Sequence, residues 1–145
     1  MTLEILLVED SDAQAQLVRQ ALKLWKTPYN LHVTGSAEDA LEFLNHSDGY
    51  ANSPRPHLAL IDLSLPKQPG FAVLEAIRQR PDLSGAVVII LSTSIAECDV
   101  KRAFPMAAAY LQKPLEWPDM MRLFEALETF WRMDVRFSNQ LAGAS

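Results

Sequence analysis

Residues 57–62, His57-Leu58-Ala59-Leu60-Ile61-Asp62, decide the fold class of this chain. Four apolar residues in a row predict a short strand that is buried on both of its faces. A carboxylate directly after such a strand lies at the sheet edge where open α/β folds place their ligands. We therefore expect a parallel sheet that carries a functional group, Asp62, at its carboxyl edge.

Three other apolar segments, at residues 5–8, 87–91 and 107–111, also run into polar side chains. The polar residues that follow these segments are, in chain order, Glu9 and Asp10, then Ser92 and Thr93, then Lys113. Because the carboxyl ends of parallel strands meet at one edge of a sheet, we expect these side chains to lie close to Asp62.

Helical patterns between the apolar segments complete five strand–helix units. Leu31 and Val33 alternate with polar residues and indicate a second, weaker strand near an edge of the sheet. The first helix follows Asp10, and its predicted inner stripe is Leu17, Ala21, Leu24 and Trp25. Ser36 is expected to cap a second helix, and the last helix is expected to run from about residue 117 to about residue 132. Right-handed crossovers predict an α/β fold, with helices on both faces of the sheet.

Composition excludes several classes of protein. The chain has 145 residues, which favours one domain, and its 49% hydrophobic content is ordinary for a globular protein. A net charge of -5 without a cluster of Lys and Arg argues against nucleic-acid binding. The single cysteine, Cys98, excludes an intramolecular disulfide. No apolar run approaches the ~18 residues of a membrane span, and a strand begins too early for a signal peptide, so we expect a cytoplasmic protein without membrane contact.

The predicted cluster suits one kind of chemistry. Carboxylates a few ångströms apart resist joint ionisation, and a hard divalent cation such as Mg2+ relieves the repulsion between Glu9, Asp10 and Asp62. An aspartate beside Mg2+ can attack phosphorus and form an aspartyl phosphate. Lys113 and Ser92 would supply a positive charge and a hydrogen-bond donor to the transferred group. Each residue alone is more often a helix cap or a solvated side chain, but together they indicate phosphoryl transfer to Asp62.

The chain resembles the receiver domain of two-component response regulators over about residues 3–130. The motifs that carry the resemblance are Leu7-Val8-Glu9-Asp10, Leu60-Ile61-Asp62-Leu63-Ser64-Leu65-Pro66 with Gly70, Leu91-Ser92-Thr93, and Tyr110-Leu111-Gln112-Lys113-Pro114. The resemblance implies a flavodoxin-like (βα)5 fold, a doubly wound five-stranded parallel sheet with strand order 2-1-3-4-5. The chain departs from the family at Pro69, which stands before Gly70 where the family usually has an aspartate.

The resemblance also implies a role for each matching residue. Asp62 would be the phosphoacceptor, Asp10 a direct Mg2+ ligand, and Glu9 an acid that acts through metal-bound water. Ser64 would give its backbone carbonyl to the metal. Ser92 and Lys113 would bind phosphoryl oxygens, Ser92 and Tyr110 would switch position on phosphorylation, and the peptide bond between Lys113 and Pro114 would be cis.

The last helix is expected to be a contact surface, because its apolar sector covers roughly half its circumference where a surface helix needs ~100°. Glu128-Thr129-Phe130-Trp131 and Leu91-Ser92-Thr93-Ser94 resemble the small single-domain regulators of bacterial and cyanobacterial phytochromes. That resemblance implies a histidine kinase partner, a phytochrome, and a homodimer through the fifth strand, last helix and C-terminal extension. The predicted interface residues are Tyr110, Trp117, Met121, Phe130 and Trp131. The receiver domain would span residues 1–132 and the extension residues 133–145, without an output domain.

Three other functions remain open. A phosphohydrolase would need a second aspartate two residues after the nucleophile, where this chain has Ser64. A nucleotide- or flavin-binding protein would need a phosphate loop after the first strand, where Glu9-Asp10-Ser11-Asp12 would repel phosphate. A phosphate-independent scaffold would keep the acidic pocket without using it. The favoured prediction is a signalling protein that catalyses only its own phosphorylation and dephosphorylation.

Overall fold

One parallel sheet forms the centre of the molecule. The computed structural model describes residues 2–47, 49–62, 70–83, 85–92, 107, 109–114 and 116–144, with side chains as far as Arg132. The strands are β1 (Leu3–Val8), β2 (Tyr29–Thr34), β3 (Leu58–Ile61), β4 (Val87–Ser92) and β5 (Ala109–Gln112). They are all parallel and lie in the order β2-β1-β3-β4-β5. The predicted fold class and strand order are therefore confirmed.

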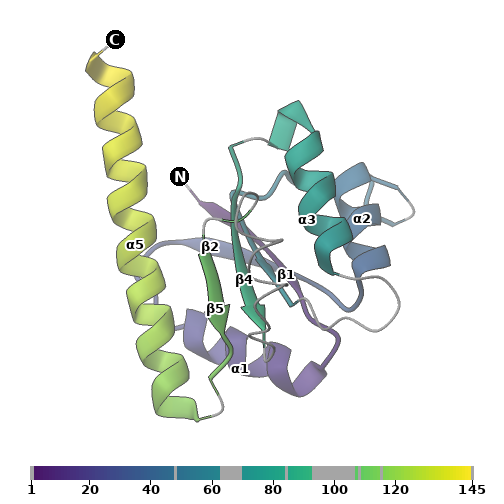
Figure 1. Cartoon of the computed structure of the whole chain (residues 1–145), viewed down its shortest axis with the longest axis horizontal. Helices are drawn as coiled ribbons and strands as arrows, with labels where there is room; N and C mark the ends of the chain where they lie inside the picture. Colours follow the sequence, from purple (N-terminus) through teal and green to yellow (C-terminus); the bar gives the residue numbers. More distant parts are fainter. Residues whose placement is uncertain are drawn as a thin grey trace.

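Helices cover both faces of this sheet. They are α1 (Asp12–Leu22), α2 (Ala37–Asn45), α3 (Gly70–Gln79) and α5 (Trp117–Ala144), with a short 3-10 turn at Pro81–Leu83. Figure 1 shows α2 and α3 side by side on one side of the sheet, with α1 and α5 on the other. The helix that we expected after Ser94 lies outside the described residues.

Each face of the sheet has its own apolar core. Successive strand residues point to opposite faces, so Leu6 and Val8 of β1 belong to the core under α2 and α3. Ile5 and Leu7 belong to the core under α1 and α5. In that second core, Phe124 of α5 is completely buried. The two cores fix the sheet between the helix layers and make its carboxyl edge a rigid platform.

Two predicted details of the helices are wrong. Leu24 is 58% exposed, because α1 ends at Leu22 and the helical period that placed Leu24 inside no longer applies. The last helix continues past Arg132 to Ala144. Residues 133–142 contain neither proline nor glycine, so nothing in the sequence ends the helix at Arg132. In Figure 1 its C-terminal turns extend beyond the sheet. Among the described residues no helix is long and apolar enough to cross a membrane.

The α1–β2 loop fastens α5 to the body. The indole N–H of Trp25 donates to the carbonyl of Phe124 at 2.8 Å. In return, the carboxylate of Glu128 accepts the backbone N–H groups of Lys26 and Thr27 at 2.8 and 2.9 Å. These bonds join segments about a hundred residues apart, so they fix where α5 crosses the sheet.

Backbone hydrogen bonds extend the sheet to the residues of the predicted site. The N–H of Glu9 donates to Thr34 at 3.0 Å, and that of Asp62 donates to the carbonyl of Val8 at 3.1 Å. The N–H of Lys113 donates to Ser92 at 2.8 Å. The residues that follow β1, β3 and β5 are therefore each held in position by the end of a neighbouring strand.

Candidate functional site

Three acids meet at the carboxyl edge of the sheet, as the sequence predicts. Glu9, Asp10 and Asp62 each offer a carboxylate oxygen, and these oxygens all lie within 4.8 Å of one another. Glu9 and Asp62 are buried, at 5% and 6% exposure, whereas Asp10 is exposed. The cluster therefore opens to solvent at Asp10 and is closed behind it.

Lys113 lies between the two buried acids. Its Nζ donates to Glu9 Oε2 at 2.6 Å and to Asp62 Oδ2 at 3.2 Å, and the residue is 7% exposed. The sequence places Lys113 at this edge but does not indicate that Glu9 is its shorter contact. Both residues follow strand ends, and only the side-chain geometry shows that they pair.

Among the described residues, the buried charges at this edge do not balance, because the carboxylates of Glu9 and Asp62 share the ammonium group of Lys113. Burial raises the pKa of Glu9, since the lost hydration, together with the charge of Asp62, outweighs the ion pair with Lys113. Burial alone would lower the pKa of Lys113, but the hydrogen bond to Glu9 and the charge of Asp62 more than offset it, so that pKa is raised. The site thus retains protons and favours an additional cation.

Ser92 and Tyr110 lie on the neighbouring strands β4 and β5, and the carbonyl of Ser92 accepts the N–H of Lys113. Ser92 is fully buried at the end of β4, opposite Gln112 in the register of β5. Tyr110 is half-buried and packs against the core under α2 and α3. Ser64, the predicted carbonyl ligand, and Thr93 lie outside the described residues.

The peptide bond between Lys113 and Pro114 is not cis, contrary to what the resemblance implies. Among the described residues no peptide bond is cis. The trans form is the more stable isomer of an X–Pro bond by about 0.5–1 kcal/mol. With this peptide bond trans, Lys113 contacts both Glu9 and Asp62.

Two residues that the sequence analysis did not assign to the site support the acids. The N–H of Ser11 donates to Glu9 Oε1 at 3.3 Å, and Ser11 also caps α1 by accepting the N–H of Gln14. Thr34, 2% exposed, donates its hydroxyl hydrogen to the carbonyl of Leu7 at 3.1 Å. In the sequence, Thr34 stands out only as the residue at the end of a weak strand, and this position does not distinguish it from an ordinary strand residue.

The donor set fits a hard divalent cation. Carboxylate oxygens are the ligands that Mg2+ and Mn2+ prefer, and such ions keep several of their water molecules. Glu9, Asp10 and Asp62 supply the oxygens, and Asp10 faces solvent, from which a hydrated ion would enter. The same edge holds the buried carboxylate of Asp62 with the ammonium group of Lys113 beside it.

The predicted interface residues of α5 divide into two groups. Trp131 is buried in the core under α1 and α5, and therefore does not belong to the surface. Trp117 and Phe130 are 36% and 45% exposed, and Met121 is half-buried. Beside Phe130 lies a groove of about 240 Å³ between β5 and α5. The groove is apolar throughout and is lined by Ile89, Ala109, Leu111, Leu123, Ala126, Leu127 and Phe130.

Comparison with known proteins agrees with this geometry. The response regulator receiver domain family matches residues 5–126. Response regulator Rcp1 of Synechocystis sp. is 40% identical over 128 residues, which are 88% of this chain and 87% of Rcp1.

Two solved structures have the same fold. The Mn2+-bound form of Rcp1 superimposes with a TM-score of 0.82, covering 88% of this chain and 93% of that one at 40% identity. The phosphorylated cyanobacterial phytochrome response regulator RcpA gives a TM-score of 0.84, covering 90% and 94% at 32% identity. With its sheet order, its acidic edge and these matches, the chain belongs to the receiver domain family of response regulators and is similar to the phytochrome response regulators within it.

Proposed function

We propose that Asp62 accepts a phosphoryl group from a phosphohistidine of a sensor kinase, in a reaction that requires Mg2+. One observation carries the proposal: Asp62 is buried 3.2 Å from the ammonium group of Lys113, and its carboxylate lies within 4.8 Å of the oxygens of Glu9 and Asp10. A phosphoryl acceptor needs a positioned nucleophile and positive charge close to it.

Each residue has a task in this reaction. A carboxylate oxygen of Asp62 attacks phosphorus while the bond from phosphorus to the histidine nitrogen breaks and the imidazole leaves with the bonding pair. Lys113 stays beside the acceptor and attracts one phosphoryl oxygen, and the Ser92 hydroxyl donates to another. Glu9 and Asp10, with the backbone carbonyl of Ser64, would hold Mg2+, which when bound neutralises negative charge on the transferred group.

The proposed kinase is a phytochrome. Support comes from the similarity to Rcp1 and RcpA, the second of which is a cyanobacterial phytochrome response regulator. A kinase that phosphorylates this chain must share its compartment, and we propose the cytoplasm. We propose that phosphorylation changes the contacts that this chain makes with other proteins.

Incubation with Mg2+ and acetyl phosphate, followed by intact mass measurement, tests the chemistry. We expect one added phosphoryl group on the wild-type chain, and none on Asp62→Asn or with Mg2+ removed. The matched control is Asp82→Asn, which removes a carboxylate from the opposite end of the molecule and should be phosphorylated like the wild type. If acetyl phosphate and a phosphorylated histidine kinase both fail, the phosphate-independent scaffold becomes the better account.

We also propose that the chain forms a homodimer through β5 and α5. β5 is an edge strand of the sheet, and the apolar groove beside it continues onto the exposed ring of Phe130. Helix α5 has 28 residues, a length of about 42 Å, and its last turns extend beyond the sheet in Figure 1. An apolar groove that continues onto an exposed aromatic ring is typical of a surface buried between two copies.

Light scattering after gel filtration tests the dimer. We expect twice the chain mass for the wild type and a single chain mass for Phe130→Glu. Leu24→Glu is the matched control, since it puts the same charge on another exposed apolar residue, 58% exposed and outside the groove. A wild-type monomer, or a Phe130→Glu variant that still dimerises, would contradict the proposed interface.

A further inference from the structure

Thr34 connects the edge strand β2 to the acids at the end of β1. It is the last residue of β2 and is only 2% exposed. Its hydroxyl donates to the carbonyl of Leu7 at 3.1 Å, and its backbone carbonyl accepts the N–H of Glu9 at 3.0 Å. Thr34 therefore holds the end of β1 at two points, at Leu7 and at Glu9, the first acid of the cluster.

Asp10 lies between this anchor and a second one. On the other side, Ser11 donates its N–H to Glu9 and fixes the start of α1 by capping the N–H of Gln14. Asp10 itself is exposed, so little packing restrains its side chain. Its position relative to Asp62 therefore depends on how firmly the backbone on either side of it is held.

We propose that the Thr34 hydroxyl positions Glu9 and Asp10 and thereby sets the affinity of the site for its divalent cation. The inference rests on the proposed function, because it concerns the same acidic site. Thr34 is a positioning residue in this account, since its hydroxyl bonds to Leu7 and not to any of the three acids. Outer partners of this kind commonly change metal affinity by tenfold or more when removed.

Calorimetric titration with Mn2+ tests the proposal on two variants of Thr34. Thr34→Val keeps the branched shape but removes the hydroxyl, whereas Thr34→Ser keeps the hydroxyl and removes the methyl group. We expect Thr34→Val to bind Mn2+ about threefold to tenfold more weakly, less than a direct ligand partner would cause because the effect passes through the backbone. Thr34→Ser should bind within about twofold of the wild type.

Ser36→Ala is the matched control. Ser36 also follows β2, and its hydroxyl accepts the N–H of Asp39 at 3.0 Å as the cap of α2. Its loss should lower Tm by roughly 2–4 °C without changing the Mn2+ affinity. Measuring Tm of every variant separates a general loss of stability from a loss of positioning.

Three results would overturn the inference. Thr34→Val could bind Mn2+ as tightly as the wild type, with or without a lower Tm, which would make the hydroxyl merely structural. Thr34→Ser could be weakened as much as Thr34→Val, which would assign the effect to packing. Finally, a wild-type chain that does not bind Mn2+ would refute the proposed site itself, and this inference with it.

If Thr34→Val does not fold, Thr34→Ala also removes the hydroxyl and allows the same comparison with a smaller side chain on the edge strand.

Discussion

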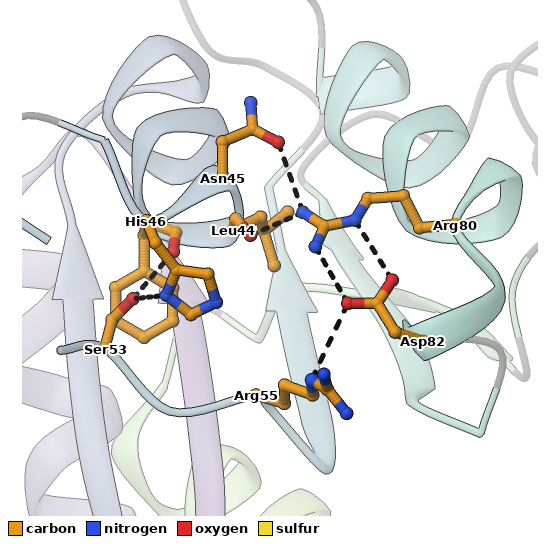
Figure 2. A network of polar contacts seen from close by, with 8 residues as sticks. Leu44, Asn45, His46, Ser53, Arg55, Arg80 and Asp82 are labelled. Atoms are coloured by element: carbon orange, nitrogen blue, oxygen red, sulfur yellow. Dashed lines mark hydrogen bonds and ion pairs between the residues drawn. The ribbon is translucent and has the colours of Figure 1, made fainter. Parts of the chain in front are cut away.

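The molecule has two charged networks at opposite ends of its sheet, and they are built in opposite ways. At the carboxyl edge, Glu9 and Asp62 share Lys113, the one buried cation in the part of the chain that the structure describes. At the amino edge, where α2 and α3 end, two arginines surround one acid, Asp82. Figure 2 shows this second network, in which the guanidinium of Arg80 reaches across from α3 to α2.

The amino-edge network is complete without any ligand. Arg80 donates two hydrogen bonds to Asp82, at 3.2 and 2.8 Å, and others to the carbonyl of Leu44 and the side chain of Asn45 at the end of α2. Arg55 adds an ion pair to Asp82 at 3.6 Å. The hydrogen bond from Arg80, ahead of the other causes, lowers the pKa of Asp82. This network joins two helices and has no excess buried charge.

The difference indicates which network carries the function. A stabilising network can place its charges in water and match them with partners. Among the described residues, the carboxyl edge instead buries an excess of negative charge. The pKa of Glu9 is raised as a consequence. Groups whose protonation is shifted by burial and by one another are concentrated at functional sites.

Lys113→Met should have the largest effect on stability, because it leaves two buried carboxylates without their cation. We expect the free energy of unfolding to fall by about 2–3 kcal/mol in metal-free buffer, somewhat less than for a fully enclosed pair because Asp10 opens the site to solvent. Urea unfolding measures this loss. Added Mg2+ should restore more stability to Lys113→Met than to the wild type, and equal gains would contradict the excess of buried negative charge.

Arg80→Met should have a smaller effect, of roughly 1 kcal/mol, because the hydrogen bonds it removes belong to a partly exposed network. Mg2+ should not compensate for it. The comparison with Lys113→Met in the same urea series is informative, since both variants replace one cation by the same side chain. If Arg80→Met were the more destabilising of the two, the amino-edge network would contribute more to stability than the buried ion pairs of Lys113, which would contradict the account.

Acid should affect the two networks with opposite signs. A raised pKa means that the contribution of Glu9 is complete below 4.5 and is lost as pH rises through the folded value. A lowered pKa means that the contribution of Asp82 is present above 3.8 and is lost as pH falls through the folded value. Unfolding measured in EDTA from pH 7 to pH 4.5 should therefore show the wild type gaining stability relative to Glu9→Gln.

Over the same range the wild type should keep a constant difference from Asp82→Asn, and this difference should shrink only below pH 3.8. If the stability differences of Glu9→Gln and Asp82→Asn from the wild type changed with pH in the same way, burial would not distinguish Glu9 from Asp82.

Sequence patterns were sufficient for the sheet and for which residues reach its carboxyl edge. Strand ends are set by runs of apolar residues, so Glu9, Asp62 and Lys113 are placed by chain position alone. Chain position does not show which of these side chains pair with one another, because pairing depends on side-chain conformations across three strands. The same limit applies to Thr34, whose hydroxyl could have bonded to water or to its own strand.

The α5 surface shows a different limit. Helical periodicity groups apolar residues but does not say which part of an apolar sector meets the sheet. The prediction therefore assigned both Trp131 and Phe130 to the interface, although the structure buries the first and leaves the second exposed. The prediction for Leu24 was wrong for a related reason: α1 ends at Leu22, so the helical period no longer fixes the direction of the Leu24 side chain.

The most direct test of the comparison is the change in Tm on adding Mg2+ to the wild type, Asp10→Asn and Asp82→Asn. A cation that binds only the folded chain raises Tm. The account predicts a rise for the wild type and for Asp82→Asn, and none for Asp10→Asn. No rise in any of the three, or an equal rise in all of them, would contradict the claim that the excess negative charge at the carboxyl edge is a divalent-cation site.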